Sequence, residues 1–224
     1  MEIGATKAVQ DRLKTTKIEE SAGASLVFCC DKHLTKIKRR NVLFIVNVSN
    51  RYTIAMTDIE PRNWNYYTMY ISRVIHGVMQ EMGYSEDQIG LYFKMSGDTT
   101  VTKTHGRKSV GGINRMVMDA QYFGKKLEKE AKYQWELSEY LNRDICQPEG
   151  FDAYGYPSEL FKLDMERLGI ARVLFAVCSG YGILYGTLKI QFVILVFLFY
   201  IFASSSRSIF VTADCFIIHI IDTA

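Results

Sequence analysis

The sequence lacks the motifs of several common classes of protein. Its five cysteines contain no C-x-x-C pair, and the adjacent Cys29 and Cys30 can hardly pair with each other, so we expect buried, reduced thiols and a cytoplasmic location. The charged N-terminus is unlike a secretion signal. There is no G-x-S-x-G, and the four histidines are widely spaced without H-x-x-x-H, so the sequence predicts no metal site and no cofactor.

Charge is almost absent from the last quarter of the chain. Beyond Ala171 only five charged residues remain, whereas residues 1–170 are rich in charges of both signs. The run IQFVILVFLFYIFA ends at Ala203, and the segment 181–203 is long enough to span a bilayer. Residues 171–224 are therefore either a hydrophobic tail with a membrane-anchoring segment or an aberrant sequence that does not fold.

The clearest strand signal is a hairpin in the middle of the charged part. Val42–Val48 is apolar on both alternating faces, as expected of a central strand that is covered on both sides. Ser49 and Asn50 supply a turn, and Arg51–Thr57 alternates as an antiparallel neighbour would. Two further short strands are predicted at Leu26–Cys30 and Leu34–Lys38.

Helical periodicity surrounds these strands. The predicted helices cover Ala5–Glu20, the segment from Pro61 to Met82, a helix to Ser96 with a Ser85/Gln88 capping box, a helix from Ser109 to about Leu141, and Ser158–Leu168. The expected fold is α+β, a small, largely antiparallel sheet packed with amphipathic helices, plus the hydrophobic tail. We expect the α+β domain at 1–120, a helical extension at 121–170 and the tail at 171–224.

Two groups of basic residues are candidate anion sites. The first is the Thr102–Ser109 segment, a strand end, a glycine turn and a helix start that carries Lys103, His105, Arg107 and Lys108. It lacks the spacing of a P-loop. The second lies around the hairpin. Its members are Lys36, Lys38, Arg39, Arg40 and Arg51. The alternative is that Ser109 caps a helix and that the charges are solvated or guard a sheet edge.

Several spaced motifs within residues 3–120 resemble the bacterial domain of unknown function numbered 6933. They are Ile3-Gly4-Ala5-Thr6-Lys7, Leu34-x-x-Ile37-x-Arg39-Arg40, Val46-Asn47 with Arg51-Tyr52, Thr102-Lys103-Thr104 with Arg107, and Val110-x-x-x-Asn114. The chain departs from the family at Cys30-Asp31-Lys32-His33, where the family often has Trp-His-Ala-Asn. The resemblance implies a small cytosolic α+β domain associated with mobile elements, and it implies no activity.

Three hypotheses follow for function. The first is a non-enzymatic binding or regulatory domain that contacts nucleic acid or a phosphate-bearing ligand. Its candidate anion-binding residues are Arg39, Arg40, Arg51, Lys103, His105, Arg107, Lys108 and Asn114. The second is an enzyme that acts on a phosphorylated small molecule with His105 as acid or base. The third is a protein-interaction module. The net charge of +3 is too small to choose among them.

Overall fold

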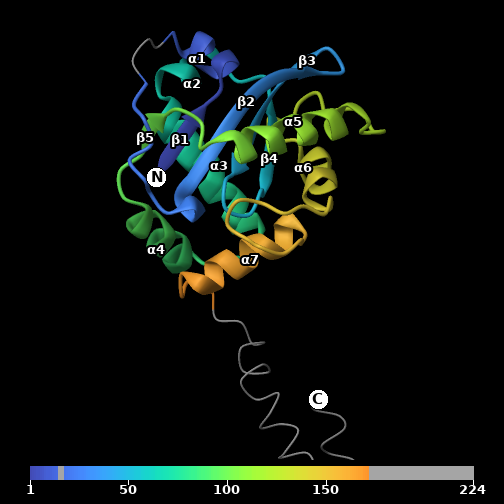
Figure 1. Ribbon diagram of the computed structural model, residues 1–224. Helices are drawn as coiled ribbons and strands as arrows, with labels where there is room; N and C mark the ends of the chain where they lie inside the picture. Colours follow the sequence, from blue (N-terminus) through green and yellow to red (C-terminus); the bar gives the residue numbers. More distant parts are fainter. Residues whose placement is uncertain (15–17, 172–224) are drawn as a thin grey trace, which may run out of the picture. The chain divides into compact units, whose positions relative to one another are not determined.

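The computed structural model describes residues 1–14 and 18–171 (Figure 1). Its centre is a five-stranded sheet in the order β4-β3-β2-β1-β5. The strands are β1 (Glu2–Ala5), β2 (Cys29–Ile37), β3 (Arg40–Asn47), β4 (Thr53–Thr57) and β5 (Thr100–Thr102). The helices are α1 (Lys7–Leu13), α2 (Pro61–Asn65), α3 (Tyr67–Glu81), α4 (Glu86–Ser96), α5 (Arg107–Gln121), α6 (Trp135–Asn142) and α7 (Pro157–Arg167).

The α+β class is confirmed, and the sheet is mixed rather than largely antiparallel. β2–β3 and β3–β4 pair antiparallel as the hairpin pattern predicts, but β1 pairs parallel with both β2 and β5. The sequence did not reveal β1, because four residues are too few to show an alternation. The helix that was expected over Ala5–Glu20 is correspondingly shorter, since α1 covers only Lys7–Leu13.

β2 is one continuous strand where two short ones were predicted. Leu26–Phe28 is a single 3₁₀ turn, and the strand then runs from Cys29 to Ile37. The prediction was wrong because Asp31 and Lys32 break the apolar pattern, yet both side chains are fully buried. At the tip, Lys38 and Arg39 both have positive φ, 48° and 69°, which is the backbone of a tight two-residue hairpin turn.

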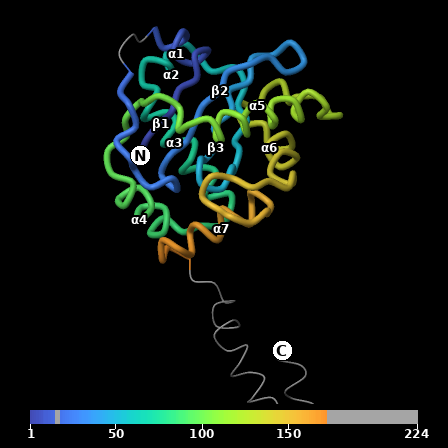
Figure 2. The backbone as a smooth tube through the Cα atoms, viewed as in Figure 1, coloured from blue at the N-terminus to red at the C-terminus, as the bar shows by residue number. Residues whose placement is uncertain are grey.

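The two faces of the sheet carry separate apolar cores. On one face Ile3, Leu43 and Ile45 pack with residues of α3, α4 and α7. On the other face Val42, Phe44 and Val46 pack with residues of α5 and α6. Figure 2 shows α5 in front of the strands and α3 behind them. The alternation of β3 between two buried faces confirms that it is a central strand covered on both sides.

Helix boundaries differ from the sequence pattern where tertiary contacts intervene. The helix expected from Pro61 to Met82 is broken at Tyr66 into α2 and α3, and the helix expected to reach Leu141 ends at Gln121. The segment 122–134 is instead held to the sheet, because the Arg40 guanidinium donates to the backbone oxygens of Leu127 and Glu128. The Ser85/Gln88 capping box and the last helix, α7, are confirmed.

The outer edge of β4 is closed by α6 and the segment before it. The backbone N–H of Ala55 donates to Ser138 Oγ at 2.9 Å, and that of Thr53 donates to Asn142 Oδ1 at 2.8 Å. The N–H of Thr57 donates to the backbone oxygen of Lys132 at 2.8 Å. Side chains of α6 and the backbone of the segment before it therefore take the place of a sixth strand and leave these amides paired.

Ser138→Ala tests this edge closure. The substitution leaves the buried N–H of Ala55 without its acceptor, and we expect it to lower the free energy of unfolding by about 1–2 kcal/mol. Urea denaturation followed by circular dichroism measures the change. Ser72→Ala is the matched control, because the Ser72 hydroxyl only bonds back to its own helix at Thr68. Equal effects of the two substitutions would contradict the role of Ser138.

The predicted hydrophobic tail falls outside the described residues, and so does its candidate membrane segment at 181–203. Among the helices of residues 1–14 and 18–171, none combines the length and the apolar character needed to cross a membrane. Residues Met1–Ala171 form one compact unit, in which α6 packs against β4.

Candidate functional site

A group of buried ionisable side chains surrounds His105 on the α5 face of the sheet. Glu2 comes from β1, and Cys29 and Asp31 come from β2, where parallel pairing sets Glu2 beside Cys29 and Gly4 beside Asp31. His105 lies in the connection from β5 to α5. Since β5 pairs with the other edge of β1, the sheet register brings residues from three distant parts of the sequence together. We refer to Glu2, Cys29, Asp31 and His105 as the His105 cluster.

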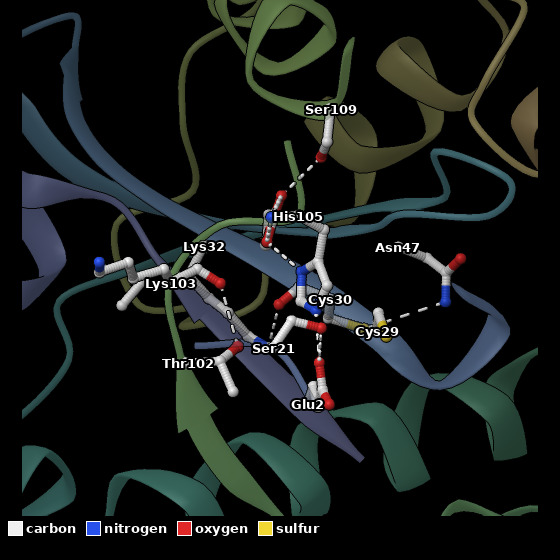
Figure 3. A network of polar contacts seen from close by, with 12 residues as sticks. Glu2, Ser21, Cys29, Cys30, Lys32, Asn47, Thr102, Lys103, His105 and Ser109 are labelled. Carbon is white, nitrogen blue, oxygen red and sulfur yellow. Dashed lines mark hydrogen bonds and ion pairs between the residues drawn. The ribbon is translucent and has the colours of Figure 1, made fainter. Parts of the chain in front are cut away.

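Both ring nitrogens of His105 face carboxylates. Nδ1 lies 2.7 Å from Asp31 Oδ1, and Nε2 lies 3.0 Å from Glu2 Oε2. The side chains of His105, Glu2 and Asp31 are 4%, 5% and 0% exposed. In Figure 3 the ring lies between Glu2 on one side and Ser109 on the other. Two carboxylates thus enclose one imidazole in a site that is almost fully excluded from solvent.

The electrostatics of the cluster follow from this enclosure. Burial acts to lower the pKa of His105, but hydrogen bonds to Asp31 and Cys29 outweigh it and raise that pKa to about 10. Burial acts to raise the pKa of Glu2, but hydrogen bonds from Ser21 and His105 bring it below its ordinary value. Without a bound cation, the cluster therefore holds an imidazolium between two carboxylates at neutral pH.

Asp31 also receives donors from the start of α5. Ser109 Oγ donates to Asp31 Oδ2 at 2.5 Å, and the backbone N–H of His105 donates to the same oxygen at 3.2 Å. Asp31 therefore places a carboxylate of the protein itself at the start of α5, where the sequence predicted that an external anion binds.

Gly4 makes room for this carboxylate. A Cβ atom on Gly4 would lie 1.9 Å from Asp31 Oδ1, which is too close for any side chain, and 3.0 Å from His105 Nδ1, which is a tight contact. The glycine of the Ile3–Lys7 motif therefore has a physical explanation, which is the close approach of Asp31 and His105 to the backbone of β1.

The segment 21–25 crosses over the cluster. Ser21 Oγ donates to Glu2 Oε2 at 2.6 Å, and the N–H of Ala22 donates to Glu2 Oε1 at 2.9 Å. Cys29 Sγ lies 3.4 Å from the backbone oxygen of Ser25. This segment, which lies between the helix predicted to end at Glu20 and the strand predicted to begin at Leu26, contributes to the burial of the site.

Three members of the cluster have the spacing of ligands to one metal ion. A carboxylate oxygen of Glu2, Sγ of Cys29 and a ring nitrogen of His105 all lie within 4.8 Å of one another. Asp31 holds the other ring nitrogen of His105, which is the outer-shell partner that metal-binding histidines usually have. Glu2, Cys29 and His105 alone would therefore give a three-coordinate metal site.

Most of the predicted anion-binding residues have partners within the protein. Arg40 bonds backbone oxygens of the 127–129 segment and pairs with Asp58. Arg51 donates to the backbone oxygen of Gly112 at 2.7 Å, and Lys108 to that of Pro148 at 2.9 Å. Lys103 is ion-paired with Glu20. Apart from His105, which belongs to the His105 cluster, the remaining three are Arg39, Arg107 and Asn114, and they are exposed.

The structure does not gather these residues into one cleft. α5 begins beside Asp31 through Ser109 and ends beside Lys36, whose backbone oxygen accepts from Gln121 Nε2 at 3.1 Å. Arg107 and the hairpin tip at Arg39 are therefore near opposite ends of α5. His105 is drawn into the internal cluster instead.

Sequence reasoning missed Glu2, Cys29 and Asp31 as members of a site. Burial of Cys29 was expected and is confirmed, but Asp31 lies between the two predicted short strands, whereas it is a fully buried residue of β2. The spacing of positions 2, 29, 31 and 105 follows no motif. Only recognition of β1 as a parallel neighbour of β2 would have brought these residues together.

Comparison with known proteins supports the resemblance found in the sequence. No curated protein and no solved structure matches the chain. Residues 2–160 match the family described as domain of unknown function DUF6933, well beyond the 3–120 range of the quoted motifs. The match includes all four residues of the His105 cluster together with α6. The chain therefore belongs to the DUF6933 family.

Proposed function

We propose that this domain binds one transition-metal ion of the zinc class through Glu2, Cys29 and His105. The proximity of their three ligand atoms, each within 4.8 Å of the other two, carries the proposal. A thiolate, an imidazole and a carboxylate form a mixed sulfur, nitrogen and oxygen set that suits Zn²⁺. Mg²⁺ and Ca²⁺ prefer sites made of oxygen atoms alone, so they are disfavoured here.

The proposed role of the ion is to join elements rather than to act on a substrate. The three ligands come from β1, β2 and the β5–α5 connection, so one ion would cross-link segments that are distant in sequence. The His105 and Glu2 side chains are at most 5% exposed, which leaves a substrate little access to the ion. A binding or regulatory domain fits this burial better than an enzyme that uses His105 on a phosphorylated small molecule.

Calorimetric titration of the chelator-treated, full-length chain with ZnCl₂ tests the proposal. We expect one ion to bind per chain. Loss of an outer-shell partner weakens metal binding by roughly 10- to 100-fold, and we expect Cys29→Ser and His105→Ala, which each remove a ligand, to weaken it by more than that. Cys146→Ser and His76→Ala are matched controls, because both residues lie away from the cluster. No zinc binding, or equal losses in the controls, would contradict the proposal.

A second proposal is that exposed cations contact an anionic partner such as nucleic acid. Arg39 and Arg107 support it, because both are exposed and neither has an ion-pair partner in the described parts of the chain. The Arg39→Ala, Arg107→Ala double variant is expected to reduce a salt-dependent nucleic-acid mobility shift. Arg62→Ala is the control and should leave the shift unchanged, because the Arg62 side chain already pairs with Glu60. Absence of salt-dependent binding by the unmodified chain would favour a protein-interaction module. An association with mobile elements is proposed with it and is tested by the genes that adjoin this one.

A further inference from the structure

A cavity of about 410 Å³ lies on the face of the sheet opposite the His105 cluster. Leu34 and Leu43, which pair across β2 and β3, form part of its lining together with Ile59. Trp64 of α2 and Arg12 of α1 also line it. The volume is within the range of about 300–1,000 Å³ that is usual for small-molecule sites.

The aromatic wall of this cavity is fixed in place. The Trp64 ring stacks on Tyr67 with centroids 5.4 Å apart and an interplanar angle of 7°. Tyr67 is only 5% exposed and belongs to the apolar core, so it anchors the indole from behind. Because Tyr67 stacks on the Trp64 ring and the Arg12 guanidinium lies over it, Trp64 offers a rigid aromatic edge beside the apolar side chains of Leu34 and Leu43, which suits an edge-to-face contact with a planar ring.

The guanidinium group of Arg12 brings a positive charge to the Trp64 side of the cavity. The Arg12 guanidinium lies 5.8 Å from the Trp64 ring centroid and has no ion-pair partner among the described residues. The acidic residue of the lining, Asp58, is paired with Arg40, so its charge is already matched. The cavity therefore combines an apolar and aromatic lining with one unmatched positive charge.

We propose that this cavity binds a small ligand made of a planar ring and an anionic group, of the nucleoside monophosphate class. The ring lies against Trp64 and the apolar lining, and the anionic group pairs with the Arg12 guanidinium. Asn41, an exposed residue of the lining, supplies an amide that can donate a hydrogen bond to the ring and accept one from it. This site is separate from the proposed metal centre, so either proposal can fail without the other.

Fluorescence of Trp64 gives a direct readout, because the chain contains only two tryptophans. In the full-length Trp135→Phe variant, titration with adenosine monophosphate should quench the emission to saturation. Adenosine should bind at least about 10-fold more weakly, because it lacks the group that pairs with Arg12. Inorganic phosphate should not quench. Benzoate separates a carboxylate ligand from a phosphate ligand, and quenching by benzoate but not by adenosine monophosphate would contradict the nucleoside monophosphate class and assign the site to aromatic carboxylates.

Substitution of the guanidinium completes the test. Arg12→Gln should lower the affinity for adenosine monophosphate to that of adenosine, while Arg62→Gln, which alters a nearby α2 cation paired with Glu60, should leave it unchanged. Both side chains are exposed, so neither variant is expected to affect folding. Equal binding of adenosine monophosphate and adenosine, or no saturable quenching by the monophosphate, would overturn the proposal.

Discussion

Asp31→Ala is expected to destabilise the chelator-treated protein by about 3–5 kcal/mol, the usual cost of removing one partner from a buried ion pair. Asp31 is fully buried and accepts hydrogen bonds from the His105 ring, the His105 backbone and the Ser109 hydroxyl. Its loss leaves a buried imidazole with one carboxylate and a helix start without its acceptor. Urea denaturation measures the effect.

Two further variants make this result specific. Asp119→Ala removes a carboxylate that pairs with Arg115 one turn away on the surface of α5, and it should cost no more than about 0.5 kcal/mol. Asp31→Asn keeps the shape of the side chain and should fold, but it should weaken zinc binding by about 10- to 100-fold because the amide holds His105 less strongly. Similar stability losses for the two alanine variants would show that Asp31 does not organise the cluster.

Lys32→Met is expected to stabilise the protein by about 2–3 kcal/mol at neutral pH. Lys32 is fully buried, and among the described residues its Nζ donates to one acceptor, the backbone oxygen of Cys30, at 3.0 Å. Burial lowers the pKa of Lys32 from its ordinary 10.5 to about 8. The fall in pKa from 10.5 to about 8 corresponds to a penalty of roughly 3 kcal/mol for burying the charged form, from which the lost hydrogen bond subtracts about 1 kcal/mol.

The sign of the pH dependence follows from the direction of that shift. Below pH 8 both the folded and the unfolded chain carry the Lys32 proton, so the penalty for a buried charge is complete. Between about pH 8 and 10.5 the folded chain releases the proton while the unfolded chain keeps it, so stability rises with pH. The stability difference between Lys32→Met and the unmodified chain should therefore shrink over this interval. Lys36→Met, at an exposed position of the same strand, is the control, and a matching pH profile for both variants would exclude Lys32 as the cause.

The parts of the fold that could be predicted from sequence are those set by local chemistry. Val42–Thr57 was recognised as a hairpin core because alternation and a turn occur within a few residues. The start of α4 was recognised because Ser85 and Gln88 satisfy each other's backbone groups. Both signals act over a distance of a few residues, where a pattern in one sequence is informative.

The site could not be predicted because it depends on pairings that are distant in sequence. β1 has only four residues, and its partners begin 27 and 98 positions later, so no local pattern reveals it. Asp31 and Lys32 interrupt the apolar pattern of the strand, and polar residues are seldom fully buried, yet Asp31 joins the His105 cluster and Lys32 is enclosed in the opposite core. The basic residues were predicted to bind an external anion at the surface. Arg40 instead donates to backbone oxygens of the 122–134 segment and holds that segment against the sheet.

Titration of the chelator-treated full-length chain with CoCl₂ tests the central claim most directly, because cobalt replaces zinc and reports its ligands through absorption. Coordination by Cys29 predicts an intense thiolate-to-metal charge-transfer band that saturates at one ion per chain. The band should vanish in Cys29→Ser, persist in Cys146→Ser and be displaced by ZnCl₂. Saturable cobalt binding without a charge-transfer band, or a band that survives Cys29→Ser, would contradict a metal centre built from Glu2, Cys29 and His105.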